Sequence, residues 1–290
     1  MEFVKAHGTG NDFVVIEDFE DRLEIGSEFV RQVCDRHFGV GADGVIRIAP
    51  SSIASFFMDY RNADGSLAEM CGNGVRVVGK YLSDRGYVAG AFDLETRAGV
   101  KHLELSVDQQ GLVDQVTVDM GAPSFDRADL PMLGEGEALK ESLEAGGESF
   151  EATCLSMGNP HAVLFVDDVD AAPVTTAGPL LEHHPAFPNL TNVEFVQVVG
   201  PQRLRQRTWE RGVGETLACG TGACAVAVAS QLRGFSGRRV TIELRGGQLE
   251  LEWTPGATVR MTGPAREVAH GTLTSEYLAA LGDSVPRPKE

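Results

Sequence analysis

Two short cysteine motifs constrain the fold of this chain more than any other feature. Cys71 begins a Cys-Gly-Asn-Gly motif, and Cys219 begins a Cys-Gly-Thr-Gly motif 148 positions later. Each motif is followed by helix-forming or apolar residues, so each thiol is predicted to lie where a helix begins. The same offset relates Gly10-Asn11 to Gly158-Asn159, Asn62 to Glu210, and Gly86 to Gly234. A repeat of this kind predicts two copies of one structural unit.

The length of the chain agrees with a duplication. A chain of 290 residues is expected to form two domains of about 130–150 residues each. The turn-forming run Gly121-Ala122-Pro123 interrupts the strand pattern between the halves. We therefore expect an N-terminal domain over residues 1–121 and a C-terminal domain over 122–272, with the segment 273–290 returning to the first domain.

Short segments of alternating polar and apolar residues dominate both halves, for example 101–107 and 203–209. This pattern predicts many short, mainly antiparallel strands. The helix expected after Cys219 is apolar on every face, which is typical of a buried helix. The expected fold class is mixed α/β (α+β), with two pseudo-symmetric domains, each a curled, mostly antiparallel sheet around a central helix.

The net charge and the length of the apolar segments limit the classes of binding partner that this chain can have. With 25 basic and 42 acidic side chains the net charge is −17, which argues against nucleic-acid binding and against an anionic membrane surface. No apolar stretch approaches the ~20 residues of a membrane span, and the start of the chain lacks a signal-peptide pattern. We therefore expect a cytoplasmic protein that binds neither nucleic acid nor a membrane.

The five cysteines are an odd number, without a Cys-x-x-Cys pair, so we expect reduced thiols and no metal site. Cys34, Cys154 and Cys224 are interpreted as buried packing residues. Cys71 and Cys219 differ, because a helix N-terminus presents unpaired N–H groups and a positive dipole. That environment is expected to lower the pKa of each thiol.

Two thiols on equivalent halves suit proton exchange at one carbon, with one sulfur as general base and the other as general acid on the opposite face. The backbone N–H groups of Gly72-Asn73 and Gly220-Thr221 are predicted to hold a substrate carboxylate and the developing charge. No lysine motif suggests pyridoxal phosphate, so no cofactor is expected. The alternatives for paired cysteines are a redox disulfide and a covalent nucleophile. A nucleophile needs one cysteine and a positioned base, whereas the duplication supplies two equal partners and favours acid–base exchange.

The chain closely resembles the diaminopimelate epimerase family over essentially its whole length. Members of that family interconvert L,L- and meso-diaminopimelate without pyridoxal, on the route to lysine and peptidoglycan. The motifs that carry the resemblance are Gly10-Asn11-Asp12-Phe13, Asn62-Ala63-Asp64-Gly65-Ser66, Met70-Cys71-Gly72-Asn73-Gly74, Gly158-Asn159-Pro160-His161, Thr191-Asn192-Val193-Glu194, Glu210-Arg211-Gly212-Val213-Gly214-Glu215-Thr216 and Ala218-Cys219-Gly220-Thr221-Gly222.

The resemblance implies roles for individual residues. Cys71 and Cys219 would be the acid–base pair, with Gly72, Asn73, Gly220 and Thr221 around the reacting carboxylate. The residues implied to bind the rest of the substrate are Asn11, Asn62, Asn159, Asn192, Glu210 and Arg211. His161 and Glu210 would adjust the pKa values of the thiols.

Two positions depart from the family pattern. Gly44 stands where some members carry a glutamine that contacts the substrate, and Ala269 stands where some carry a tyrosine that supports a dimer. A homodimer remains compatible with the resemblance. The alternatives are a proline or hydroxyproline racemase, which would not need Arg211 and the asparagines, and a thiol-redox or binding protein.

Overall fold

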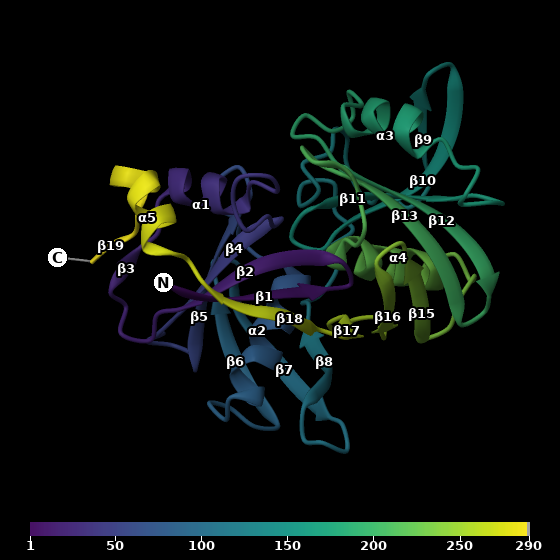
Figure 1. Ribbon diagram of the computed structural model, residues 1–290. Coiled ribbons are helices and arrows are strands. Elements are labelled where there is room, and N and C mark those ends of the chain that lie inside the picture. Colours follow the sequence, from purple (N-terminus) through teal and green to yellow (C-terminus); the bar gives the residue numbers. More distant parts are fainter. Residues whose placement is uncertain (289–290) are drawn as a thin grey trace. The chain divides into compact units, whose positions relative to one another are not determined.

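The computed structural model describes residues 1–288; Lys289 and Glu290 lie outside the described residues. The chain divides into two compact units (Figure 1). The first unit contains Met1–Val118 and the chain from Gly263 onward, and the second contains Asp119–Thr262. Strand β18 (Arg266–Thr272) pairs antiparallel with β1 (Glu2–Gly8), so the chain returns to the first unit before the expected residue 273.

The first unit is built on one sheet with the strand order β18–β1–β2–β4–β5–β6–β7–β8. Its other strands are β2 (Asn11–Glu17), β4 (Gly44–Ala49), β5 (Phe56–Asn62), β6 (Ala91–Thr96), β7 (Gly99–Val107) and β8 (Val113–Asp119), and its helices are α1 (Ser27–Cys34), α2 (Gly72–Asp84) and α5 (Ser275–Leu281), with a 3-10 turn at Gly282–Ser284. Two short strands, β3 (Leu23–Glu24) and β19 (Arg287–Pro288), pair separately.

Helix α2 is the central helix of this unit. Most of its residues are buried, and it contacts β1, β5, β7 and β18, which come from both ends of the sheet order. A sheet whose distant strands touch one helix must curl around that helix. Gly79 permits the close approach, because a Cβ there would lie 2.9 Å from the Leu103 side chain.

The second unit repeats this plan, with the strand order β9–β10–β11–β12–β13–β15–β16–β17 and β14 beside β13. Its strands are β9 (Glu141–Ala145), β10 (Glu148–Ser156), β11 (Pro160–Phe165), β12 (Asn192–Gly200), β13 (Arg203–Glu210), β14 (Gly214–Thr216), β15 (Arg239–Leu244), β16 (Gly247–Glu252) and β17 (Arg260–Gly263), and its helices are α3 (Val174–Glu182) and α4 (Gly220–Leu232).

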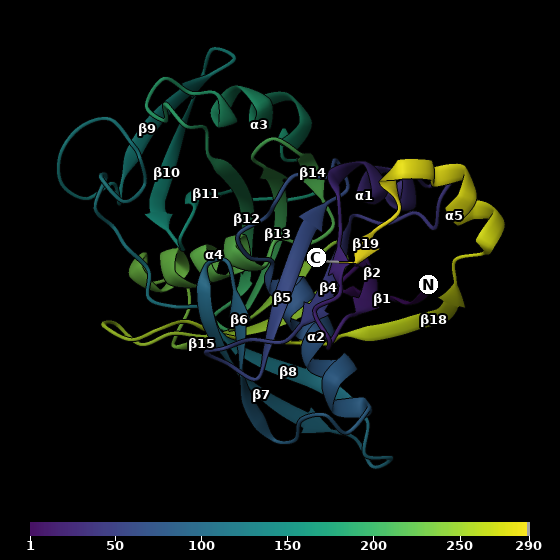
Figure 2. The same ribbon diagram turned by 90° about the vertical axis from the view of Figure 1, so that its left-hand side faces the viewer.

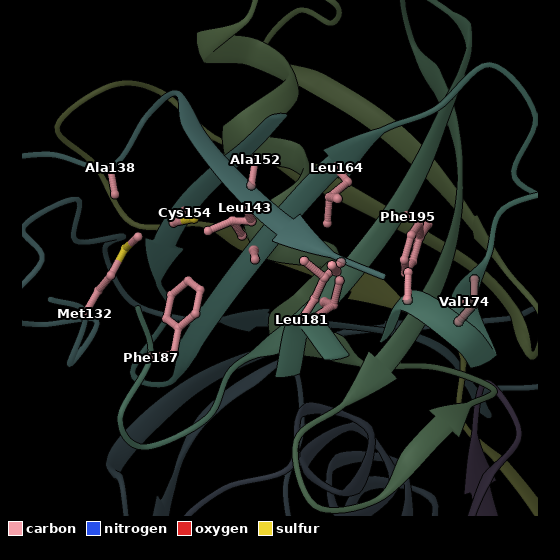
Figure 3. Close-up of a cluster of buried hydrophobic side chains, with 14 of the residues drawn as sticks. Met132, Ala138, Leu143, Ala152, Cys154, Leu164, Val174, Leu181, Phe187 and Phe195 are labelled. Carbon is pink, nitrogen blue, oxygen red and sulfur yellow. The ribbon is translucent and has the colours of Figure 1, made fainter. Parts of the chain in front are cut away.

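Helices α3 and α4 lie on opposite sides of the strands of the second unit (Figures 1 and 2). Alternate strand residues therefore face different helices. Leu164 and Phe195 pack with Leu181 of α3 and with Phe187 in the core of Figure 3. Buried α4 occupies the other side, where it contacts β10, β11, β12, β15 and β16. No helix in residues 1–288 is both long and apolar enough to cross a bilayer.

The two sheets share a sequence of pairings. In the first unit β1·β2 is antiparallel, β2·β4 parallel, β4·β5 antiparallel, β5·β6 parallel and β6·β7 antiparallel. In the second unit β10·β11, β11·β12, β12·β13, β13·β15 and β15·β16 repeat that order. The register also keeps the offset, since Phe13 pairs with Gly44 and His161 with Asn192. The expected fold class, mixed α/β with two pseudo-symmetric curled sheets, is confirmed.

Candidate functional site

Cys71 is the N-cap residue of α2, with an extended backbone (φ −139°, ψ 112°). Its Sγ donates to Asn11 Oδ1 at 3.4 Å, and Asn73 Nδ2 donates to the same oxygen at 3.3 Å. Asn11 lies at the start of β2, directly beside the beginning of α2. The structure therefore brings Asn11, Cys71, Gly72 and Asn73 together from two separate motifs.

A cluster of charged side chains behind Asn11 fixes its orientation. Asn11 Nδ2 donates to Asp43 Oδ2 at 2.8 Å, which leaves Oδ1 facing Cys71. Arg36 bridges Asp43 and Asp12, at 2.7 and 2.8 Å. Burial opposes ionisation of Asp12, but hydrogen bonds from Arg36 and Lys5 outweigh it and hold the Asp12 pKa well below its usual range. These carboxylates were not among the predicted site residues.

Arg76 anchors the other side of this half-site. Arg76 lies in α2, and its side chain is fully buried. Its guanidinium donates to Asn73 Oδ1 at 2.8 Å, to Thr9 Oγ1 at 3.1 Å and to the Pro264 carbonyl at 3.2 Å. Arg76 therefore orients the Asn73 amide toward Asn11. Sequence reasoning missed it, because an arginine in a helix is ordinarily a solvent-facing residue.

Asn62 and Gly44 face each other in register on β5 and β4. Asn62 Nδ2 donates to Ser66 Oγ at 3.0 Å. A Cβ on Gly44 would lie 2.4 Å from the Arg61 carbonyl oxygen and 2.5 Å from the Tyr60 ring. Tyr60, packed edge-on against Phe13, thus fills the space into which a side chain at position 44 would extend. A glutamine contact from this position is sterically incompatible with the arrangement.

This packing predicts that Gly44→Ala destabilises the first unit by about 1–3 kcal/mol, since one of the clashing atoms is backbone and cannot move aside cheaply. Chemical denaturation measures the change. Gly200→Ala is the matched control, because a Cβ at Gly200 meets no atom within 4 Å. Equal denaturation midpoints for the wild type and Gly44→Ala would contradict the packing described here.

Cys219 occupies the equivalent place in the second unit, as the N-cap residue of α4 (φ −114°, ψ 113°). The Gly222 backbone N–H donates to its Sγ at 3.4 Å, and Thr221 Oγ1 lies 3.5 Å from Sγ. Only 6% of Cys219 is exposed. Gly220 and Thr221 form the first turn of α4 beside this sulfur.

A chain of hydrogen bonds leads from the Cys219 sulfur into the sheet. Asn159 Nδ2 donates to Thr221 Oγ1 at 3.3 Å, and Asn159 Oδ1 lies 2.9 Å from His161 Nε2. His161 Nδ1 lies 2.8 Å from Glu194 Oε1, and both of these residues are fully buried. Asn159, His161 and Thr221 are thus brought together as one network that ends at Glu194.

The pKa of Cys219 differs from the expectation. A helix N-terminus was expected to lower it, but burial raises the pKa of Cys219 well above its usual value, with further increases from Glu210 and Glu194. Hydrogen bonds from Thr221 and Gly222 lower the pKa of Cys219, but the effect of burial is larger. The pKa of Glu210 is also raised, first by burial, although Thr216 donates to it at 2.5 Å. The cause is desolvation, which only the tertiary structure determines.

Asn192 and Arg211 have contacts that the motifs alone did not show. Asn192 Nδ2 donates to the Pro160 carbonyl at 2.8 Å, and its Oδ1 accepts the Arg211 backbone N–H at 3.0 Å. The Asn192 side chain therefore holds the backbone next to two predicted site residues. The Arg211 side chain is exposed and donates to the Asn189 carbonyl at 3.4 Å.

Glu194 is the residue of this half-site that sequence reasoning missed. It ends the Thr-Asn-Val-Glu motif, and strand alternation places it on the same face as Asn192. A carboxylate within an otherwise apolar run, Val193-Glu194-Phe195-Val196, was the available signal. Such a residue inside a buried strand requires a partner.

Solved structures that share this fold include amino-acid racemases and epimerases and also proteins of the phenazine-biosynthesis PhzF family. A probable proline racemase from Agrobacterium radiobacter has a TM-score of 0.70 at 15% identity, covering 94% of this chain and 93% of that chain. A hydroxyproline epimerase from Agrobacterium vitis has a TM-score of 0.68 at 18% identity, covering 94% and 90%. At these identities the similarity establishes the fold alone.

Sequence similarity is much higher to the diaminopimelate epimerases. The family model described as diaminopimelate epimerase matches residues 3–125 and 153–268. The diaminopimelate epimerase of Pelotomaculum thermopropionicum is 53% identical over 275 residues, 93% of this chain and 98% of the relative. That of Heliobacterium modesticaldum is 50% identical over 279 residues, 94% and 99%. The chain belongs to the diaminopimelate epimerase family and is an isomerase.

Proposed function

We propose that the protein interconverts L,L- and meso-diaminopimelate by cofactor-independent proton exchange between Cys71 and Cys219 at one α-carbon, in the biosynthesis of lysine and peptidoglycan precursors. One observation carries the mechanism. The two thiols cap equivalent helices in two sheets that repeat the same pairings and register. A duplicated site supplies two comparable acid–base groups, which inversion at carbon requires.

In the proposed reaction one sulfur acts as a thiolate and removes the α-hydrogen as a proton. The electron pair of the C–H bond stays on the substrate, delocalised into its carboxylate. The other thiol then delivers its proton to the opposite face of the carbon. One thiolate has become a thiol and one thiol a thiolate, so atoms and charge balance and the reverse reaction exchanges the roles. Backbone N–H groups at the starts of α2 and α4 stabilise the developing charge.

We assign the protonated sulfur of the resting enzyme to Cys219. Burial and the neighbouring carboxylates of Glu210 and Glu194 raise its pKa, so its thiol form is favoured. Cys71 then acts first as the base, and its ionised sulfur gives up the hydrogen bond that the thiol form donates to Asn11 Oδ1. In this proposal Cys219 accepts a proton when the reaction runs in reverse.

The remaining predicted residues orient the substrate. The exposed guanidinium of Arg211 is suited to a second carboxylate, which it can bind through two parallel hydrogen bonds. Asn62 and Glu210 occupy equivalent strand ends, and the carboxylate of Glu210 is suited to a substrate ammonium group. Asn159 and Asn192 hold the loops around them through their amide groups.

The decisive experiment incubates the reduced enzyme with L,L-diaminopimelate in deuterated water. Deuterium at one α-carbon, together with formation of the meso isomer, is the expected result, and mass spectrometry with chiral chromatography measures both. L-Proline and trans-4-hydroxy-L-proline are run in parallel. Exchange on either of these and none on diaminopimelate would replace the proposal by the racemase alternative.

A further inference from the structure

Glu194 is a fully buried acid, and its two carboxylate oxygens differ in their hydrogen bonding. Its Oε1 contacts His161 Nδ1 at 2.8 Å, whereas its Oε2 has no hydrogen-bond partner among the described residues. It also lies close to the thiol of the second half-site. A Cβ built on Gly222 would lie 2.6 Å from Glu194 Oε1 and 3.2 Å from Cys219 Sγ. The carboxylate and the sulfur therefore share one small space beside the start of α4.

The hydrogen-bond directions in this space determine where protons reside. Asn159 Nδ2 donates to Thr221 Oγ1, so Asn159 Oδ1 is the atom that faces His161 Nε2. A carbonyl oxygen only accepts, and His161 Nε2 must therefore carry a proton. The hydrogen bond between His161 Nδ1 and the Glu194 carboxylate can then have its proton in one of two positions. Either Nδ1 donates to the carboxylate, or a protonated Glu194 donates to Nδ1. In both forms the pair shares a single proton.

A histidine without such a partner would act differently on a neighbouring cysteine. A neutral imidazole near a thiol can take up its proton, and the resulting thiolate beside an imidazolium is the reactive form of nucleophilic cysteines. Here His161 already shares a proton with Glu194. A thiolate at Cys219 would add an uncompensated negative charge next to that pair in a buried site, which is unfavourable.

We propose that Glu194 is a positioning residue that commits His161 to a closed proton-sharing pair, and thereby keeps Cys219 a protonated acid–base group and not a nucleophilic thiolate. This inference rests on the proposed acid–base role of Cys219. It extends that role to Glu194, whose charge acts on the Cys219 sulfur.

The surrounding titratable groups are consistent with this role. Strand β11 contributes His161, β12 Glu194, β13 Glu210 and β10 Cys154. The pKa of Cys154 is raised, mainly by burial. Glu210 accepts a hydrogen bond from Thr216, and a side-chain hydrogen bond also links Glu210 to Cys219. The pKa of Cys219 is raised by burial first and by Glu210 and Glu194 next, so the charge of Glu194 acts in the proposed direction.

The test follows the Cys219 thiol directly, in protein labelled with 13C at the cysteine Cβ atoms. The NMR signal of Cys219 is identified by its loss in Cys219→Ala, and its shift is followed with pH. In Glu194→Gln we expect the thiol-to-thiolate transition about one pH unit or more below that of the wild type. His161→Gln added to Glu194→Gln should return the transition toward its wild-type position, because no imidazole remains to take up the proton.

Glu243→Gln is the matched control, since Glu243 lies on β15 of the same unit and contacts Arg203 at its surface. It removes an equal charge and is expected to leave the Cys219 transition unchanged. The proposal is overturned if the thiol-to-thiolate transition of Cys219 occurs at the same pH in Glu194→Gln as in the wild type. It is also overturned if Cys219 remains a thiol up to the highest pH measured in both Glu194→Gln and the wild type. A shift that survives in the double variant also overturns it, because Glu194 would then not act through His161.

A second measurement keeps the proposal testable if Glu194→Gln fails to fold. In the unmutated protein, 15N NMR of the histidine rings should show a proton on His161 Nε2 and a hydrogen bond at Nδ1, as the contacts to Asn159 and Glu194 require. A His161 ring without a proton on Nε2 contradicts the pairing. Neither readout depends on turnover, so absence of epimerase activity toward diaminopimelate would refute the proposed function and leave this result interpretable.

Discussion

Cys71→Ala and Cys219→Ala are each expected to lower kcat/KM for epimerisation by about 10³-fold, in both directions of the reaction. Each direction needs one sulfur to take the α-proton and the other to return a proton on the opposite face. Alanine offers neither function. Removing both cysteines together should cost little more than removing one, because groups that act as a unit are not additive.

The measurement starts from L,L-diaminopimelate and, separately, from the meso isomer, and follows the opposite isomer by chiral chromatography. Cys34→Ala is the control, since Cys34 is a buried thiol packed in the core of the first unit and its removal should leave kcat/KM close to wild type. Activity that persists in either Cys71→Ala or Cys219→Ala would show that the reaction does not use two thiols.

Arg76→Met is expected to reduce the free energy of unfolding of the first unit by about 2–4 kcal/mol and to abolish most of the activity. The guanidinium is fully buried and donates to Asn73 Oδ1, Thr9 Oγ1 and the Pro264 carbonyl. Methionine retains much of the volume but provides no donors. Buried acceptors would lose their partners, and the Asn73 amide would no longer be oriented toward Asn11 and Cys71.

Urea denaturation followed by circular dichroism measures the stability change. Arg85→Met is the matched control at the C-terminal end of the same helix, where the arginine is partly exposed and pairs with Glu267. A partly exposed pair contributes little, so we expect a change of at most about 1 kcal/mol. If Arg76→Met unfolds at the same urea concentration as the wild type, the buried network does not stabilise this unit.

The duplication could be read from the sequence because it is encoded locally. A cysteine followed by Gly-x-Gly and a helix-forming run predicts a helix start wherever it occurs, and both predicted starts are present at Cys71 and Cys219. The constant offset then carries through to strand register, where Phe13 faces Gly44 and His161 faces Asn192. Register repeats because side chains alternate with a fixed period along a strand.

Arg76 and Glu194 could not be assigned from the sequence in the same way. A helical arginine is ordinarily solvent-facing, and the apolar run around Glu194 indicates a buried carboxylate without indicating which residue is its partner. Thr9 reaches Arg76, and His161 reaches Glu194, only after separate segments have folded together. The prediction that the helix N-terminus lowers the pKa of Cys219 was wrong. Burial raises this pKa by more than the hydrogen bonds of the helix N-terminus lower it.

The sequence by itself determined that the chain is a duplicated mixed α/β protein with one cysteine at the start of a central helix in each half, and it pointed to the diaminopimelate epimerase family. Those features depend on periodicity, turn residues and motifs, which are properties of short segments. Only the tertiary structure decided that Tyr60 fills the space beside Gly44, and that a Glu194–His161 pair adjoins Cys219. Steric exclusion and desolvation depend on neighbours distant in the sequence, so no local pattern reports them.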